Sequence, residues 1–291
     1  MQQAGRQAGA CTNLAKRRRV PFWLCTYDHL RIHAQTVRAP QPCTRLAGGD
    51  QAASLTRFIF CLTLAKARRV MKVVGIWRYP VKSMAGERLS VVELTGAGFV
   101  GDRVVQVYDA HGRIVTARRF PRLLRLRAML GPEGEPLVDG MPWDSPEAAA
   151  RVEAAVAPGA WLERFEGPER FDILPLLVCT DGAVSMFGRD VRRLRPNILI
   201  GGVDGAGERR WPGVTLRLPH AEVAIADLRG RCVMTTYDPD TNQQDSGVLR
   251  DIVRRFGGRL SLNAHVIRPG QVAEGDTVEL LSHAHDMQHA H

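Results

Sequence analysis

Cysteine is scarce over most of this 291-residue chain. Four of the six cysteines lie within residues 1–70, and only Cys179 and Cys232 follow them. Two thiols in the remaining three quarters of the chain cannot form a framework of disulfides, so the main body suits a reducing compartment. The absence of any Cys-x-x-Cys pair argues against a structural zinc site. No cysteine follows Cys232, which excludes a plant-type iron–sulfur module at the C-terminal end.

Long apolar runs are also missing. The longest uncharged apolar stretch near the start is FIFCLTLA, residues 58–65, far short of the roughly 20 residues that a membrane-spanning helix needs. The segment KRRRVPFWLC, residues 16–25, has a basic start but no adequate apolar region behind it, which disfavours a secretory signal peptide. We therefore expect no transmembrane segment and a cytoplasmic location, with organelle targeting by the basic N-terminal residues as the alternative.

Acidic residues are almost absent from residues 1–70, which we call the leader. The leader holds 12 lysine and arginine residues but only Asp28 and Asp50, so it accounts for the whole formal net charge of +10. The rest of the chain is neutral, and nucleic acid is therefore not expected as a partner of the folded body. A disordered arm, a targeting peptide and an untranslated upstream extension all fit the leader. We favour the last, because a clean strand pattern begins at Met71.

Short strand patterns dominate from Met71 onward, which predicts a mostly β fold of barrel type with a few short helices. A hairpin is expected over residues 103–116, with its turn at Asp109, His111 and Gly112. A half-buried strand is expected over 123–130, because Leu124, Leu126, Ala128 and Leu130 alternate with Arg125, Arg127 and Met129. Further strands are expected at 72–80, 89–94, 176–180, 197–202, 214–218, 222–226, 263–267 and 276–281.

Two segments predict helices. In residues 145–159, Ser145 can cap the helix, Pro146 suits its first position, and a Pro-Gly pair ends it. The segment SGVLRDIVRRFGG, residues 246–258, predicts an amphipathic helix closed by its glycines. The apolar face of that helix is expected to consist of Leu249, Ile252, Val253 and Phe256.

Lysine and arginine recur at positions where they can bind an anion. Lys82 and Ser83 lie in a loop, and a lysine beside a hydroxyl can bind an anionic group, although an ordinary surface loop fits as well. Arg103 precedes one strand of the hairpin, while Thr116 and Arg118 follow the other, so the hairpin brings them together. The alternative is a surface pair of Arg103 with the preceding aspartate and solvated arginines.

Two further segments carry candidate residues. Arg195, a proline and Asn197 start a strand, where the Asn197 amide can bond a ligand or only the backbone of a plain turn. Downstream, Glu208 can orient a neighbour and Trp211 can belong to the core. Cys232 follows Arg231, and nearby positive charge favours the thiolate that binds metals or attacks electrophiles. A buried inert thiol is the alternative for Cys232, and it is the favoured interpretation of Cys179, in an apolar strand.

Taken in order, five segments resemble the MOSC family, named for the C-terminal domain of molybdenum cofactor sulfurase, together with its N-terminal β-barrel companion. These segments are YPVKSMAGE (79–87), GDRVVQVYDAHGRIVTARRFP (101–121), RRLRPNILI (192–200), ERRWPG (208–213) and RCVMTTYDPDTN (231–242). Within the family, the chain looks similar to the stand-alone amidoxime-reducing components and their bacterial relatives. Composition sets apart the leader over 1–70 and a histidine-rich tail over 283–291. Between them, the resemblance implies an N-terminal barrel domain over 71–170 and a MOSC domain over 171–282.

The resemblance also implies a cofactor and a reaction. It implies a molybdenum cofactor, Mo-molybdopterin, with Cys232 as the metal ligand and catalytic residue. The reaction implied is the reduction of N-hydroxylated or N-oxide-type substrates, with electrons from a separate ferredoxin, flavodoxin or cytochrome b5-type protein. A sulfur carrier with a persulfide on Cys232 is the alternative, and the family also carries a pyridoxal phosphate label. The residues implied to bind the cofactor are Lys82, Ser83, Arg103, Thr116, Arg118, Arg195, Asn197 and Arg231.

Overall fold

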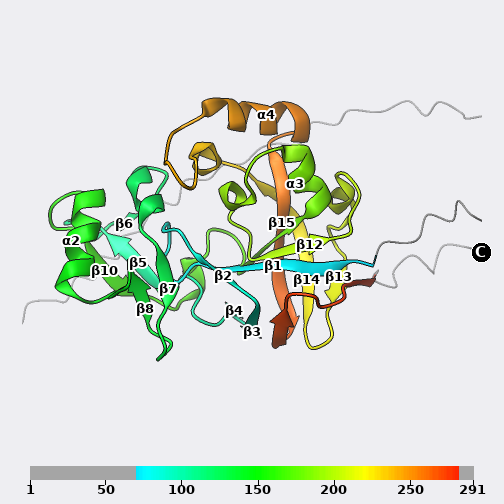
Figure 1. Cartoon of the computed structure of the whole chain (residues 1–291), viewed down its shortest axis with the longest axis horizontal. Helices are drawn as coiled ribbons and strands as arrows, with labels where there is room; N and C mark the ends of the chain where they lie inside the picture. Colours follow the sequence, from blue (N-terminus) through cyan, green and yellow to red (C-terminus); the bar gives the residue numbers. More distant parts are fainter. Residues whose placement is uncertain (1–69, 282–291) are drawn as a thin grey trace, which may run out of the picture. The chain divides into compact units, whose positions relative to one another are not determined.

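Strands make up most of the regular structure in the computed structural model, which describes residues 70–281 (Figure 1). The fold of these residues is mostly β with three short helices, as the strand patterns predict. None of those helices has the length and the apolar character needed to cross a lipid bilayer. The predictions for the leader, apart from its last residue, and for the histidine-rich tail lie outside the described residues.

The largest sheet has eight strands in the order β17-β13-β14-β15-β11-β12-β1-β2. Apart from the parallel pair β11 and β12, its neighbouring strands are antiparallel. In β1 exposed and buried residues alternate from Lys72 to Gly75, because that strand covers one side of the core, and Ile76 and Trp77 are then both buried. The strands of this sheet are β1 (Lys72–Arg78), β2 (Glu87–Leu89), β11 (Leu176–Thr180), β12 (Ile198–Gly201), β13 (Thr215–Arg217), β14 (Glu222–Gly230), β15 (Arg259–Arg268) and β17 (Glu279–Leu281).

Three smaller sheets have three strands each, in the orders β10-β5-β6, β16-β3-β4 and β7-β8-β9. The hairpin expected over residues 103–116 is confirmed as the antiparallel pair β5 and β6, which turns at Asp109 and Gly112. The strands of the small sheets are β3 (Val91–Thr95), β4 (Gly98–Phe99), β5 (Val105–Tyr108), β6 (Ile114–Val115), β7 (Ala128–Leu130), β8 (Pro136–Val138), β9 (Met141–Pro142), β10 (Trp161–Arg164) and β16 (Gly270–Ala273).

Strands from the two ends of the described chain pair with each other. Ile76 of β1 lies opposite Ile198 of β12, and Val92 of β3 lies opposite Val272 of β16. The first strands after Met71 therefore share sheets with strands from the C-terminal half. The domain boundary expected near residue 170 stays a prediction.

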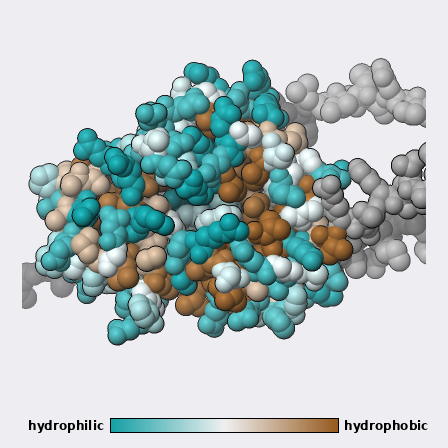
Figure 2. Space-filling model, in the orientation of Figure 1, coloured by the Kyte–Doolittle hydropathy of each residue, from teal (hydrophilic) through white to brown (hydrophobic). Residues whose placement is uncertain are grey.

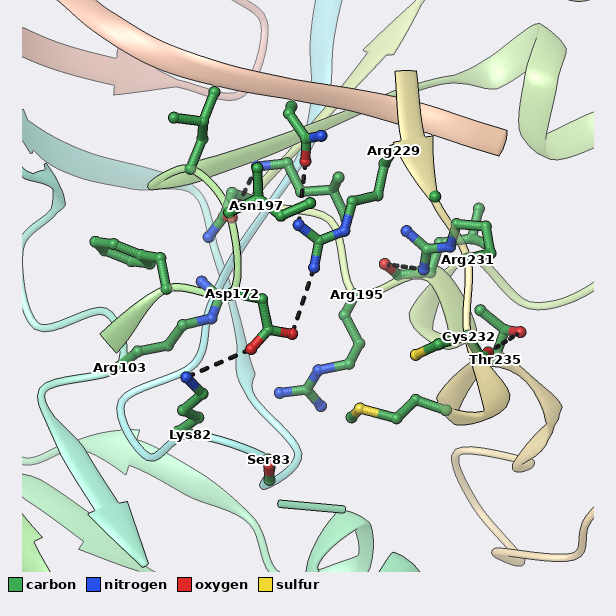
Figure 3. A pocket seen from close by; sticks show the side chains of 18 of the residues that line it. Lys82, Ser83, Arg103, Asp172, Arg195, Asn197, Arg229, Arg231, Cys232 and Thr235 are labelled. Carbon is green, nitrogen blue, oxygen red and sulfur yellow. Dashed lines mark hydrogen bonds and ion pairs between the residues drawn. The ribbon is translucent and has the colours of Figure 1, made fainter. Parts of the chain in front are cut away.

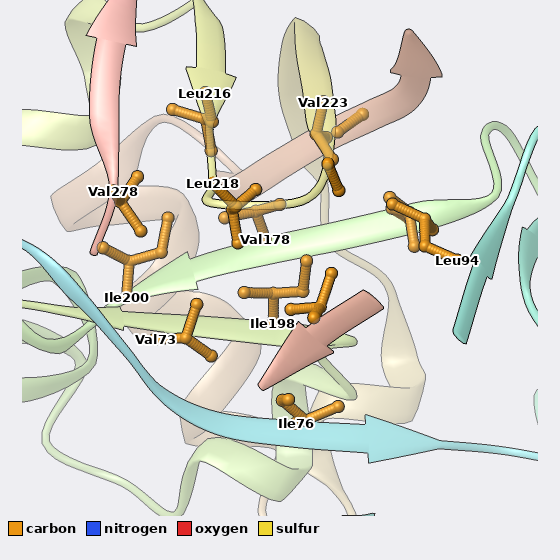
Figure 4. Packing of buried hydrophobic residues seen from close by; sticks show 14 of the residues in the cluster. Val73, Ile76, Leu94, Val178, Ile198, Ile200, Leu216, Leu218, Val223 and Val278 are labelled. Carbon is orange, nitrogen blue, oxygen red and sulfur yellow. The ribbon is translucent and has the colours of Figure 1, made fainter. Parts of the chain in front are cut away.

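Three groups of buried apolar side chains stabilise these elements. The first lies inside the large sheet and includes Ile76, Ile198 and Leu216 (Figure 4). The second joins β5 to helix α2 and includes Val107 and Val152. The third packs α3 and α4 against the sheet. Burial of each such aliphatic side chain contributes about 1.5–3 kcal/mol, so these groups are the main source of stability.

Local sequence signals set the ends of the helices. Helix α2 (Pro146–Ala155) begins as predicted, because the Ser145 hydroxyl accepts a hydrogen bond from the Ala148 amide at 3.2 Å. Helix α4 (Ser246–Phe256) ends at Gly257, which adopts the left-handed conformation that glycine tolerates best. The 3-10 helices are η1 (Pro121–Arg125), η2 (Pro168–Arg170), η3 (Val191–Leu194), η4 (Gly207–Arg210) and η5 (Val233–Thr236).

Three details of the predicted elements are wrong. The strand expected over 123–130 is 3-10 helix η1 followed by the short strand β7, because the alternation begins only at Leu126. Val253 of α4, which is expected on the apolar face of the helix, is 58% exposed. Val248, which is not among the residues expected on that face, is buried. A third helix, α3 (Asp181–Phe187), was not predicted; the Thr180 side chain caps it and Gly188 ends it.

The surface differs from place to place in its polarity. Hydrophilic residues cover most of the face shown in Figure 2, and hydrophobic residues gather near the region of β1 and β12. Val74 on β1 is 42% exposed there, which is a common degree of exposure for a single surface valine.

Replacement of Gly182, in the first turn of α3, tests how closely that helix packs against the backbone of residues 203–205. A Cβ atom at this position would lie 2.2 Å from the Val203 carbonyl oxygen and 2.4 Å from that of Gly205. Gly182→Ala is therefore expected to lower the free energy of unfolding by about 1–3 kcal/mol, because backbone must move to make room. Thermal unfolding measures the effect.

Gly96 provides the matched control, because nothing lies within 4 Å of a Cβ at that position and its backbone is not left-handed. Gly96→Ala should leave the unfolding temperature unchanged or raise it slightly, since alanine restricts the unfolded chain. Equal unfolding temperatures for the two variants would show that α3 does not pack as described.

Candidate functional site

A cavity of about 360 Å³ contains all nine of the predicted site residues in its lining (Figure 3). They come from the loop after β1, the two ends of the β5–β6 hairpin, the start of β12 and the end of β14. We call it the cationic cavity. The predicted residues in its lining are Lys82, Ser83, Arg103, Thr116, Arg118, Arg195, Asn197, Arg231 and Cys232. Its volume lies within the range of small-molecule sites, about 300–1,000 Å³.

Three of these residues have an unusual backbone. Ser83, Arg103 and Arg195 have φ angles of 74°, 56° and 54°, in the left-handed region. Such a conformation costs a non-glycine residue on the order of 1–3 kcal/mol and persists only where the surrounding structure imposes it. Its occurrence at three positions around one cavity indicates that the backbone there is shaped to present these side chains.

The buried carboxylate of Asp102 explains how Arg103 is held. One Asp102 oxygen accepts the Tyr79 amide at 2.7 Å, and the other accepts the Asn197 side-chain amide at 3.2 Å as well as the Arg103 guanidinium. Asp102 is fully buried. The sequence leaves open that Asp102 and Arg103 form only a surface pair. They form a buried ion pair instead, and both oxygens of Asp102 accept hydrogen bonds.

Tyr79 lies between two of the cavity's arginines. The Arg195 guanidinium carbon is 4.3 Å from the centre of the ring, and that of Arg103 is 5.0 Å away. The Tyr79 hydroxyl donates to the Pro196 carbonyl at 3.1 Å, and burial raises its pKa above the usual range. The tyrosine stays neutral and serves as a flat surface on which both cations are oriented.

Asn197 is held by contacts within the protein. Its amide nitrogen donates to the Trp77 carbonyl and to Asp102, each at 3.2 Å, and its oxygen accepts the Leu177 amide at 3.1 Å. Both of its N–H donors are thus already used, and the side chain is fully buried. The role of Asn197 in binding a cofactor stays a prediction; its observed contacts join β1, β11 and Asp102.

Asp172 is a site residue that the sequence did not reveal. Its carboxylate lies 2.9 Å from Arg118 and 3.4 Å from both Lys82 and Arg229 (Figure 3). Partial burial favours the protonated form, but the three cations outweigh it and hold the pKa of Asp172 below the usual value. Of the residues between 70 and 281, Asp172 is the one acidic residue that lines this cavity, and it fixes the positions of three basic ones.

Positive charge is in excess around the cavity. Seven basic side chains line it: Lys82, Arg103, Arg118, Arg193, Arg195, Arg229 and Arg231. Burial lowers the pKa of Arg231 to about 10, so the guanidinium remains charged at neutral pH. One of its terminal nitrogens donates to the Leu194 carbonyl at 2.7 Å, whereas its buried Nε has no partner among the described residues. This excess charge and the unpartnered donor fit an anionic ligand.

The two described cysteines have different surroundings. Cys232 is half-buried in the lining of the cavity, and its carbonyl accepts the Thr235 hydroxyl at 2.9 Å. Cys179 is 1% exposed and donates to the Ser261 hydroxyl at 3.0 Å. Burial raises the pKa of the Cys179 thiol to about 12. Only Cys232 of the two is placed to bind a metal or a reagent that enters the cavity.

Glu208 and Trp211 lie outside the cavity. Glu208 is buried and accepts the Thr180 hydroxyl at 2.8 Å and the Ser261 amide at 2.9 Å, so it orients the residue that bonds Cys179. Burial raises the pKa of this carboxyl. Trp211 packs in the first apolar group. Both residues support the sheet behind the cavity.

The difference between the two thiols predicts selective alkylation. Iodoacetamide at mildly alkaline pH is expected to modify Cys232 and to leave Cys179 unmodified, because a buried thiol with a raised pKa offers little thiolate. Peptide mapping by mass spectrometry reports the two sites separately. Addition of a denaturant serves as the control and should make Cys179 react as well. Equal labelling of both cysteines in the folded protein would contradict the described burial.

Comparison with known proteins gives two family matches. The MOSC N-terminal beta barrel domain matches residues 70–163, and the MOSC domain matches residues 184–279. Among solved structures, the YUAD protein from Bacillus subtilis is 14% identical, with a TM-score of 0.42, over 74% of this chain and 97% of its own.

Several relatives of this chain are mitochondrial amidoxime reducing components. Mitochondrial amidoxime reducing component 2 is 26% identical in Homo sapiens and 25% identical in Macaca fascicularis, in each case over 66% of this chain and 74% of the relative. The human mitochondrial amidoxime-reducing component 1 is 25% identical over 60% of this chain and 70% of the relative. The two domain matches together cover most of the described residues, and this chain belongs to the MOSC family.

Proposed function

We infer that the protein is a molybdenum-cofactor-dependent oxidoreductase that reduces N-hydroxylated or N-oxide-type compounds. The observation that carries this proposal is the presence of one accessible thiol, Cys232, among seven basic side chains in a single cavity. Molybdopterin carries a phosphate and a dithiolene, and a soft thiolate suits the metal. Membership of the MOSC family and likeness to amidoxime reducing components support the same assignment.

Each predicted residue has a role in this proposal. Lys82, Ser83, Arg103, Thr116, Arg118, Arg195, Asn197 and Arg231 would hold the pterin and its phosphate, and Cys232 would be the protein ligand of molybdenum. When bound, the cofactor supplies the two-electron chemistry. The residues of the chain bind and orient it, and the buried Asp102 keeps Arg103 and Asn197 in place.

The proposed reaction requires a source of electrons. Conversion of an N–OH group to N–H releases water and consumes two electrons and two protons. We propose that a separate ferredoxin, flavodoxin or cytochrome b5-type protein supplies the electrons, and that the protein works in the cytoplasm. An association with pyridoxal phosphate, expected from the family label alone, stays a prediction.

Replacement of Cys232 tests the proposed metal ligand. Serine has nearly the same shape as cysteine but is a poor soft ligand, so Cys232→Ser should fold normally and lose reduction of benzamidoxime with reduced viologen as donor. Molybdenum content, measured in protein from a host that makes the cofactor, should fall in parallel. Cys179→Ser is the matched control and should retain both metal and activity, because its hydroxyl can replace the thiol as donor to Ser261.

The same pair of variants distinguishes the persulfide alternative. A sulfur carrier would contain no molybdenum but would carry an additional sulfur atom on Cys232, visible by mass spectrometry. Parental rates of reduction in Cys232→Ser would instead show that the thiol is only a packed side chain.

Replacement of Arg195 tests whether the arginines bind the cofactor. Loss of a charge-assisted contact costs about 1.5–3 kcal/mol, so Arg195→Gln should lower pterin content by roughly 10- to 100-fold when the cofactor is limiting. Fluorescence of the oxidised pterin reports the content, and the unfolding temperature of the cofactor-free protein should change little. Arg122→Gln, an exposed arginine outside the cavity, is the control. Equal pterin content in both variants would oppose the assignment.

A further inference from the structure

A second cavity, of about 660 Å³, adjoins the cationic cavity. Both contain Arg193, Arg195 and Met234 in their linings, and Met234 lies two residues after Cys232. These three shared residues lie at the boundary between the two cavities. A molecule in the second cavity can therefore place one end beside them, next to the Cys232 side. The second cavity itself does not include Cys232, Lys82 or Ser83.

The charges in the second cavity are not balanced. Its two acidic residues, Asp190 and Asp240, both bind the same guanidinium, that of Arg192, at 2.7–3.1 Å. Two of its other arginines also have carboxylate partners, Arg88 with Glu274 and Arg193 with Asp238. The acids near the cavity are thus already neutralised.

Arg125 and Arg127 have no such partner. Both line the second cavity, and among residues 70–281 no carboxylate forms an ion pair with either side chain. The Asp139 carboxylate accepts the Arg127 backbone amide, at 2.9 Å, rather than its side chain. They stand close together at the end of η1 and the start of β7. Two unpaired guanidinium groups at one cavity wall form a suitable binding site for a carboxylate, which can accept hydrogen bonds from both.

Aromatic side chains form another part of the wall. Trp77, Tyr79 and Tyr237 line the cavity, with Leu124 and Pro239 beside them. The Arg88 guanidinium carbon lies 5.6 Å from the Trp77 ring, and that of Arg195 lies 4.3 Å from Tyr79. Trp77 and Tyr79 are nearly buried, and these guanidinium groups lie over their rings. The partly exposed surface left for a substrate ring is therefore that of Tyr237, Leu124 and Pro239. An aromatic ring can pack on those side chains and stack on guanidinium planes.

We propose that the second cavity is the substrate-binding site and that it selects aromatic N-hydroxylated substrates with a carboxylate on the side away from the N–OH group. This inference rests on the proposed function. Arg125 and Arg127 bind the carboxylate, and Tyr237, Leu124 and Pro239 pack on the ring. The N–OH group points past Met234 and Arg195, which line both cavities, toward the Cys232 side. The two arginines act as specificity-determining residues and take no part in the chemical step.

The test compares 4-carboxybenzamidoxime with its methyl ester, which has nearly the same shape but no charge. Calorimetry on the cofactor-loaded full chain measures the affinity of each compound without requiring turnover. The protein should bind the carboxylate roughly 10- to 100-fold more tightly than the ester. The double variant Arg125→Gln with Arg127→Gln should lose this preference while it binds the ester as the parent does.

Arg122→Gln is the matched control, because Arg122 lies on the same 3-10 helix, is exposed and does not line the cavity. This variant should keep the parental preference. Equal affinities for the two compounds in the parent, or an unchanged preference in the double variant, would overturn the inference.

Turnover separates the inference from the proposed function. Reduction of both compounds with no difference in affinity would leave the proposed function intact and refute the selective site. Tight, arginine-dependent binding of the carboxylate without any reduction would support the selective site and refute the reductase assignment.

Discussion

The buried carboxylate of Asp102 is the contact on which the candidate site depends. It joins the backbone at Tyr79, the side chain of Asn197 and the guanidinium of Arg103, which lie in segments far apart in the chain. A buried charge without partners is strongly unfavourable, so these groups must come together whenever the protein folds. Through Asn197 the same contact extends to the backbone of β1 and β11. The positions of the cavity's residues therefore follow from the pairing of the sheet.

The cost of gathering positive charge is the second constraint. Like charges in one cavity repel each other, and burial lowers the pKa of Arg195, Arg229 and Arg231. Asp172 offsets part of this repulsion, and stacking on Tyr79 orients two of the guanidinium groups. The remainder is best offset by a bound anion, which would stabilise the folded protein by an amount that grows with the logarithm of its concentration once that exceeds Kd. Strain at three positions of the backbone fits the same interpretation, since a binding site retains strain that a purely structural region would lose.

Much of the fold and of the cavity could be predicted from local signals in the sequence. Ser145 and Pro146 mark the start of α2, and the two ends of one hairpin bring Arg103 and Arg118 to the same cavity. Asp172 could not be predicted, because its role arises from three cations that approach it from distant segments. Helix α3 is short and apolar, so its pattern resembles a strand, and Val253 shows that periodicity defines a helix face only to within about one position.

Pairing between the first and last strands also bears on how the protein is made. β1 cannot form its pair with β12 until the chain through Gly201 has left the ribosome, and β3 cannot pair with β16 until Ala273 has left it. Contacts of such long sequence separation slow folding. During synthesis β1 and β3 can pair with β2 and β4 on one edge, but the other edge of each waits for its late partner. Edges that stay open for so long are prone to association with other chains. Cys232 follows β12 in the chain, so the cationic cavity also lacks its lining thiol until much of the C-terminal half has been made.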